Sequence, residues 1–259
     1  MLALMLAANG AAGQTKKTIR QKPKPIQKRK KIEPPEVFTP AVRLPSVYEQ
    51  PLSRGSEILK LANAAHGGAA LDNLKTLRLI GRMRVDNHFY DYKILVDTAR
   101  NRVREESRGN ADYFYVRQAE ETSGWVFAGG AKRPIEDFER RELQKFLFTR
   151  LLGLRGDSSK NINLKIVEVN DYEKIKTLRG EINGETYSWG FDGDNLLISE
   201  SVLYKPETNT TLFDDFRTIE NIKFPHRATT ALGSLLLIVD WTSIEANVAL
   251  TENDWAVPQ

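Results

Sequence analysis

The chain has 259 residues, 41% hydrophobic and 28% charged, a globular composition with enough length for one large all-β domain or two smaller ones. It contains no cysteine, which excludes disulfides, thiolate metal ligands, cysteine nucleophiles and a lipid anchor on an N-terminal cysteine. The formal net charge is +4, but nine lysines and arginines lie between Thr15 and Lys31 without any acid. The rest of the chain is therefore acidic, and we expect no nucleic acid among its partners.

Residues 1–13 are apolar and end in the small residues Gly10-Ala11-Ala12-Gly13. An apolar run followed by small residues is typical of a secretory signal peptide, and this one is too short to cross a bilayer. The alternative is a frayed cytosolic terminus, which would expose Leu-Met-Leu to water. We predict a signal-peptide-like segment and export to the periplasm or cell envelope.

Residues 14–54 combine the basic run with prolines such as Pro23, Pro25, Pro34 and Pro35. Like charges repel, proline disfavours helix, and little apolar surface is present to offset the loss of chain entropy. We predict a disordered basic, proline-rich tether. The tether is either a solvated linker or a segment that binds an anionic surface. In the second case each basic residue would contribute on the order of 1 kcal/mol to the free energy of binding.

The folded domain is predicted over residues 55–259. A short helix over 56–68, closed by Gly67-Gly68, precedes the first strand at 76–85. In that strand Leu77, Leu79 and Met83 alternate with arginines, which indicates one buried and one exposed face. Further strand-like segments follow at 88–97, 101–107, 112–118, 124–130, 161–169, 172–182, 185–192, 196–204, 211–227 and 235–247. Tight turns join them without any βαβ rhythm, so we predict a mostly β (α+β) fold built on one antiparallel sheet.

One long helix is predicted at 134–154, with Pro134 in its first turn. The first half is amphipathic. In the second half apolar residues, among them Phe146, Leu147 and Leu151, extend beyond a single stripe. Such a segment must be covered nearly all round or must itself cover a hydrophobic opening.

No pattern in the chain predicts catalysis. The three histidines His66, His88 and His226 lack metal-ligand spacing, and no Gly-x-Ser-x-Gly elbow, phosphate loop or dinucleotide fingerprint occurs. We predict a protein that is not an enzyme and uses no metal or cofactor. Aromatic residues recur on the predicted strands, which indicates either an ordinary core or a ligand cavity; the apolar helix favours the cavity.

Four short motifs near the C-terminus resemble the LolA-like lipoprotein-sorting superfamily. They are Asp215-Phe216-Arg217, Phe224-Pro225-His226-Arg227, Glu245-Ala246-Asn247 and Trp255-Ala256-Val257-Pro258. Residues 62–83, ANAAHGGAALDNLKTLRLIGRM, also resemble the helix, glycine pair and first strand of periplasmic members. The resemblance covers residues 56–258 and implies an open antiparallel half-barrel, with helices covering a concave face that shields acyl chains.

The resemblance implies a carrier or sensor that binds the acyl chains of a lipoprotein or lipid. It also implies a monomer that interacts with inner- or outer-membrane partner proteins. The arginine that latches the lid of the classical carrier has no assigned counterpart here. We predict twelve lipid-binding residues: Leu79, Met83, Tyr92, Ile94, Trp125, Phe127, Phe146, Leu147, Leu151, Trp189, Phe191 and Val239. Phe146, Leu147 and Leu151 would form the lid.

Two alternatives remain open. The half-barrel could instead be a protein-docking or regulatory module of the envelope, with a collapsed cavity. An envelope hydrolase on a similar sheet is the third reading, and it lacks a catalytic constellation.

Overall fold

The computed structural model describes residues 51–110, 113–156, 165–172, 174–203 and 208–258. The signal-peptide-like segment and residues 14–50 of the predicted tether lie outside these ranges, so both remain predictions. Residues 51–54, which we assigned to the tether, form the first turn of helix α1 (Pro51–Ala65) instead. Proline is favoured in a first helical turn because no intrahelical partner is lost there.

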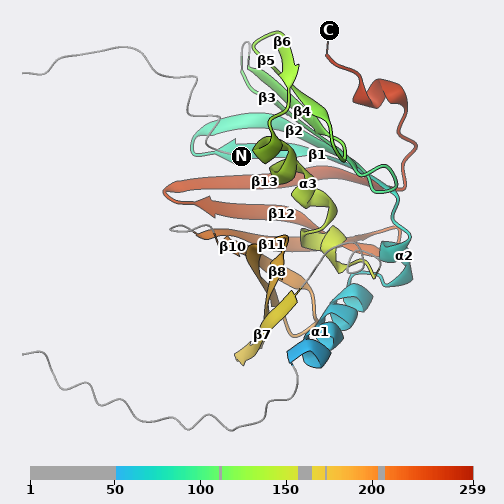
Figure 1. The fold of residues 1–259 in the computed structure, drawn as a ribbon, viewed down its shortest axis with the longest axis vertical. Coiled ribbons are helices and arrows are strands. Elements are labelled where there is room, and N and C mark those ends of the chain that lie inside the picture. Colours follow the sequence, from blue (N-terminus) through green and yellow to red (C-terminus); the bar gives the residue numbers. More distant parts are fainter. Residues whose placement is uncertain (1–50, 111–112, 157–164, 173, 204–207, 259) are drawn as a thin grey trace, which may run out of the picture. The chain divides into compact units, whose positions relative to one another are not determined.

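A single antiparallel sheet of 13 strands forms the framework of the described residues (Figure 1). The strands are β1 (Thr76–Val85), β2 (His88–Asp97), β3 (Arg102–Arg108), β4 (Phe114–Ala119), β5 (Gly124–Ala128), β6 (Ala131–Pro134), β7 (Lys165–Tyr172), β8 (Ile175–Ile182), β9 (Glu185–Phe191), β10 (Leu197–Leu203), β11 (Thr208–Ile219), β12 (Ile222–Leu232) and β13 (Leu235–Ala246). Their order is β6-β5-β4-β3-β2-β1-β13-β12-β11-β10-β9-β8-β7. The described parts of β6 and β7 do not pair with each other, so the sheet is an open half-barrel, as the sequence predicted.

Short helices accompany the sheet: α2 (Ala69–Asp72), α3 (Asp137–Gln144) and the 3-10 segments η3 (Lys145–Leu147), η4 (Arg150–Leu154) and η5 (Glu252–Trp255). In Figure 1, α3 and the segments after it lie across one face of the sheet. Contacts of α3 with β3 and β4, and of η4 with β10, show that this crossing spans both halves of the sheet. We call the covered face the concave face.

The single long helix predicted at 134–154 is wrong. Pro134 ends β6, where it pairs with Trp125, and α3 stops at Gln144. Thr149 is extended and Arg150 has a φ of 55°, a left-handed conformation that is costly for a residue with a side chain. The break persists because the Arg150 N–H bonds the carboxylate of Glu200 (2.8 Å) rather than a carbonyl of its own helix.

The face assignment predicted for β1 is confirmed. Leu77, Leu79 and Met83 are buried, whereas Arg82 and Arg84 on the other face are exposed. The register between β1 and β13 shifts after Ile80, at Gly81. A Cβ at that glycine would lie 2.2 Å from the carbonyl oxygen of Asp240, so only glycine permits the close approach of the two strands.

The hairpin of β11 and β12 accommodates Pro225 where β12 has a strand neighbour on one side only. Its turn residues Glu220 and Asn221 both have positive φ (50° and 63°), as a type I′ turn requires. β12 pairs with β13 only from Arg227 onward, so residues 222–226 have a strand neighbour on one side. His66 occupies the free side, because its carbonyl accepts the Lys223 N–H (3.1 Å). Proline is tolerated at such an edge-like position.

The motif Trp255-Ala256-Val257-Pro258 attaches the C-terminal end of the chain to the sheet. Trp255 in η5 is buried and lies under the guanidinium of Arg102 (4.6 Å from the ring centroid). Arg104 donates to the carbonyl oxygen of Ala256 (2.6 Å). The motif therefore fastens the end of the chain to the convex face of β3, away from the lid. Among the described residues, no helix is long and apolar enough to cross a membrane.

Candidate functional site

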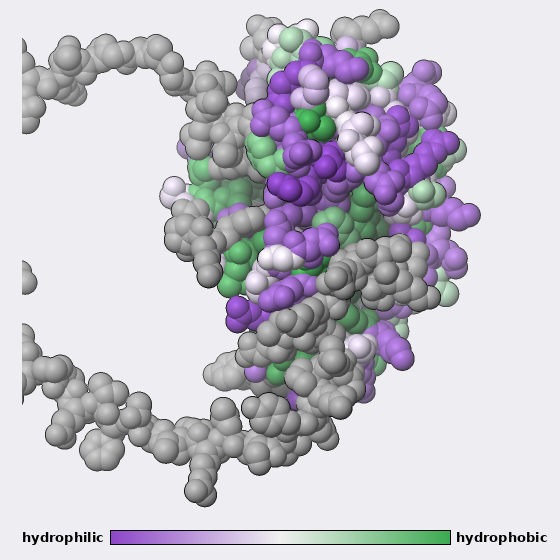
Figure 2. Space-filling view, in the orientation of Figure 1, coloured by the Kyte–Doolittle hydropathy of each residue, from purple (hydrophilic) through white to green (hydrophobic). Residues whose placement is uncertain are grey.

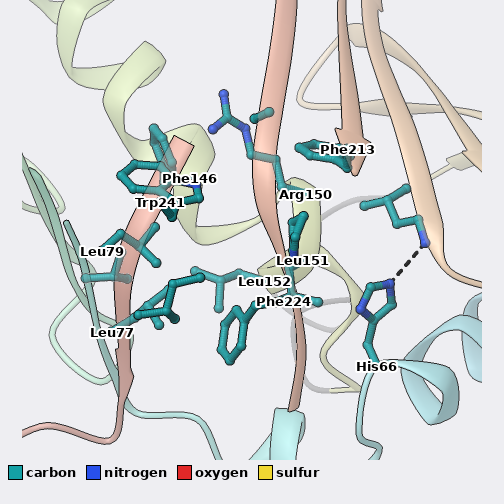
Figure 3. Close-up of a pocket in the computed structure, with 15 residues that line it drawn as sticks. His66, Leu77, Leu79, Phe146, Arg150, Leu151, Leu152, Phe213, Phe224 and Trp241 are labelled. Carbon is teal, nitrogen blue, oxygen red and sulfur yellow. Dashed lines mark hydrogen bonds between the residues drawn. The ribbon is translucent and has the colours of Figure 1, made fainter. Parts of the chain in front are cut away.

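An apolar cavity of about 70 Å³ lies between the concave face and the segments that cross it (Figure 3). Its lining residues are His66, Leu77, Leu79, Val96, Phe146, Arg150, Leu151, Leu152, Leu197, Phe213, Phe224, Pro225, Ala228, Trp241 and Ile244. Side chains from β1, β11, β12 and β13 form the floor. Phe146, Arg150, Leu151 and Leu152 form the roof, and we call residues 145–154, which carry them, the lid.

Polar contacts tie the lid to β9, β10 and α1. The Lys145 ammonium pairs with Glu185 on β9 (2.8 Å). The Glu200 carboxylate on β10 accepts the N–H of Arg150 and the indole N–H of Trp189 (3.0 Å). At the far end of the lid, Asn63 of α1 donates to the carbonyl oxygen of Leu154 (3.0 Å). Glu200 is buried, so its hydrogen bonds form where water competes poorly. The lid has no place in the strand ladder of the sheet, so local opening of the lid does not require the sheet to unfold.

The α1 side of the cavity is closed by His66, which is 1% exposed. Its Nε2 accepts the backbone N–H of Leu197 (3.0 Å), so Nδ1 carries the proton and donates to the carbonyl oxygen of Lys223 (2.7 Å). The dashed line in Figure 3 marks the bond to Leu197. Burial lowers the pKa of His66. The hydrogen bond to the Lys223 carbonyl and the negative charge of Asp192 raise this pKa, and the positive charge of Lys223 lowers it, so the net shift is downward. The neutral ring therefore joins α1 to β10 and β12.

A polar cluster is buried on the concave face of β2–β4. Glu105 accepts hydrogen bonds from the Tyr92 hydroxyl and the Arg117 guanidinium. Burial raises the pKa of Tyr92, and Glu105 raises it further, while Arg117 and Arg150 oppose the rise. Burial disfavours the charge of Arg117, but Glu105 outweighs it and the pKa of Arg117 is raised. Glu105 is thus fully engaged by neighbours within the sheet.

Ten of the twelve residues predicted to bind lipid occupy three kinds of position, and the other two lie on the opposite face of the sheet. Leu79, Phe146 and Leu151 line the cavity. Six residues are buried on the same face but beyond the cavity wall: Met83, Tyr92, Ile94, Trp189, Phe191 and Val239. Leu147 in η3 is half-buried outside the lining.

Trp125 and Phe127 do not share the concave face. Trp125 pairs with Gln118 and Phe127 with Val116, and the registers of β1–β5 place both on the face of Arg78 and Ile80. There Arg104 and Lys132 lie over the Trp125 ring, at 5.3 and 5.7 Å from its centroid. Val126 is the buried residue of β5 that faces the concave side.

Sequence reasoning missed several lining residues, notably Phe213, Phe224, Trp241 and Arg150. Trp241 follows Val239 by two residues, so the alternation that selected Val239 also pointed to it. Arg150 interrupts the apolar run of the lid, and that interruption was a visible signal. In the part of the chain that the structure describes, no group of three or more histidines and acids could hold a metal ion.

Comparison with solved structures identifies the fold. A LolA superfamily protein from Nitrosomonas europaea is similar at a TM-score of 0.51 and 14% identity, over 78% of this chain and 97% of that one. A putative outer membrane lipoprotein-sorting protein domain from Vibrio parahaemolyticus is similar at 0.54 and 10%, over 78% and 97%. A DUF1329 family protein from Desulfovibrio piger is similar at 0.55 and 10%, over 80% and 97%.

These identities establish the fold alone. No protein-family model matches the sequence, and no curated protein matches it at a significant level. The chain has a LolA-like fold.

Proposed function

We propose, from the LolA-like fold and the covered cavity, that this protein is a non-catalytic carrier or sensor of the bacterial cell envelope. It binds the acyl chains of a lipoprotein or lipid on the concave face of the half-barrel. The observation that supports the proposal best is the apolar cavity between the sheet and a lid that lies outside the strand ladder. The predicted signal-peptide-like segment and basic tether agree with an envelope location.

Binding requires the lid to move. Sites for small ligands usually measure about 300–1,000 Å³, whereas this cavity holds about 70 Å³. On the side shown in Figure 2, hydrophilic side chains predominate and hydrophobic ones show only in patches between them. In this structure the cavity is therefore smaller than an acyl ligand requires. Each methylene that enters would contribute about 0.8 kcal/mol, which offsets the cost of lifting the lid.

The test is native mass spectrometry of the exported protein, before and after denaturation. A discrete adduct that extracts as a lipid would support the proposal, and its mass would indicate the lipid class. Added acyl ligands would then be tested on Ala228→Leu, which fills the cavity, and on Ala231→Leu, which adds the same atoms at an exposed site of the same strand.

We expect Ala228→Leu to weaken binding about tenfold or more and Ala231→Leu to leave it unchanged. If no lipid copurifies and no added acyl ligand binds, the carrier proposal fails. The small closed cavity would then favour the second candidate, a half-barrel that serves as a docking or regulatory module for a protein partner.

A further inference from the structure

Arg150 is the one residue with a permanent charge among the described residues that line the cavity. The other titratable lining residue is His66, whose burial favours the neutral ring. Figure 3 shows the Arg150 guanidinium near Phe146, well separated from His66. The charge therefore sits on the lid side of an otherwise apolar cavity.

The Arg150 guanidinium has a hydrophobic neighbour but no acidic partner. It lies 4.2 Å from the centroid of the Phe146 ring. Within the described ranges it makes no ion pair and no hydrogen bond; the bond to Glu200 comes from the Arg150 backbone N–H. Glu105 is engaged by Arg117 and Tyr92.

An unpaired, half-buried cation is costly, and stacking on an aromatic ring recovers only part of that cost. An anion delivered by a ligand would pair with the guanidinium through charge-assisted hydrogen bonds, which are about twice as strong as neutral ones. Because the rest of the lining is apolar, the same ligand must carry a hydrocarbon chain. A cationic headgroup would be repelled, and a neutral one would gain nothing from the charge.

We propose that the ligand is an anionic amphiphile, whose chain enters the cavity and whose carboxylate or phosphate pairs with Arg150. This inference rests on the proposed function and narrows the class of lipid. It also gives the lid a part in selection, because the residue that contacts the headgroup belongs to the segment that must move.

The test compares four amphiphiles with the same 12-carbon chain on the full-length protein: dodecanoate, dodecyl phosphate, 1-dodecanol and dodecyltrimethylammonium. Binding is measured by titration calorimetry below the concentrations at which each compound aggregates. We expect the two anions to bind about 10- to 100-fold more tightly than dodecanol, and the cation to bind more weakly than dodecanol. Whichever anion binds better identifies the headgroup, and either result supports the proposal.

Variants of Arg150 test whether this residue causes the preference for anionic headgroups. Arg150→Gln should remove the preference for anions while retaining dodecanol binding, and Arg150→Lys should keep part of the preference. Arg84→Gln, at an exposed position on the convex face of β1, is the matched control and should behave as the wild type. Thermal unfolding of each variant confirms that it folds, and the comparison of headgroups on the wild type needs no variant.

Two outcomes would overturn the proposal, and they differ in what they mean for the proposed function. Equal affinity for dodecanoate and dodecanol would refute the anion preference and leave the acyl carrier standing. Failure of all four amphiphiles to bind would refute both.

Discussion

Two glutamates are buried on the concave face, and their partners differ. Glu105 on β3 is bound by an arginine and a tyrosine of the neighbouring strands. Glu200 on β10 is bound by a backbone N–H of the lid and an indole N–H. The first joins strands that the sheet already holds together, whereas the second joins the sheet to the lid, which lies outside the strand ladder. From this difference we expect the half with Glu105 to be more rigid than the half with Glu200.

The largest expected effect comes from breaking the pair in the rigid half. Arg117→Met leaves Glu105 buried without its charge partner, so we expect the free energy of unfolding to fall by about 3–5 kcal/mol. Urea denaturation measures this. The control is Arg227→Ala, which breaks a half-exposed pair with Asp240 (2.6 Å) and should change the free energy of unfolding much less, because solvent screens an exposed pair. Equal losses in the two variants would contradict the assignment of Glu105 and Arg117 to the rigid half.

A smaller effect is expected at the other glutamate. Glu200→Ala leaves the N–H groups of Arg150 and Trp189 unpaired, so the free energy of unfolding should fall by about 1.5–3 kcal/mol. Hydrogen exchange should accelerate in lid peptides well beyond this global change and not in β2–β4. Uniform acceleration across the sheet would mean that Glu200 does not act on the lid selectively.

The pH dependence of stability tests the closure by His66. Because burial lowers the pKa of His66, the unfolded chain binds a proton that the folded chain resists. The stabilisation is fully present above about pH 6.5, the usual histidine value, and is lost as the pH falls toward the lowered pKa of the folded state. Wild type should therefore lose stability relative to His66→Gln between pH 7 and 5. Parallel pH profiles of the two proteins would exclude this role.

The smallest effect concerns salt. The Arg227–Asp240 pair is half-exposed, so 1 M NaCl should remove most of its small contribution to the free energy of unfolding. The buried pair of Glu105 and Arg117 should respond much less. Salt titration of wild type, Arg227→Ala and Arg117→Met separates the two pairs.

The sheet was predictable from the sequence because alternation and turn chemistry are local signals. β1 is the clearest case, since its apolar residues and its arginines fall on opposite faces. The broken lid was not predictable, because it depends on a bond between Arg150 and Glu200, 50 residues apart. Local helix propensity alone predicts that the helix continues through this break to residue 154.

The positions of Trp125 and Phe127 show a second limit. Both faces of β5 carry apolar residues, so alternation could not decide which face is concave. The register decides it, and cations over the Trp125 ring stabilise an aromatic residue on the convex side. The sequence thus predicted a covered apolar cavity, and three of the twelve predicted residues, Leu79, Phe146 and Leu151, line the cavity of the structure.

The most direct test of the account is hydrogen exchange of the lid with and without a bound 12-carbon anion such as dodecanoate. Ligand binding should displace the lid, so we expect exchange at Arg150 and its neighbours in residues 145–154 to accelerate while exchange in β1–β4 stays unchanged. A ligand that binds without any change in lid exchange would contradict the claim that the lid must move to admit it.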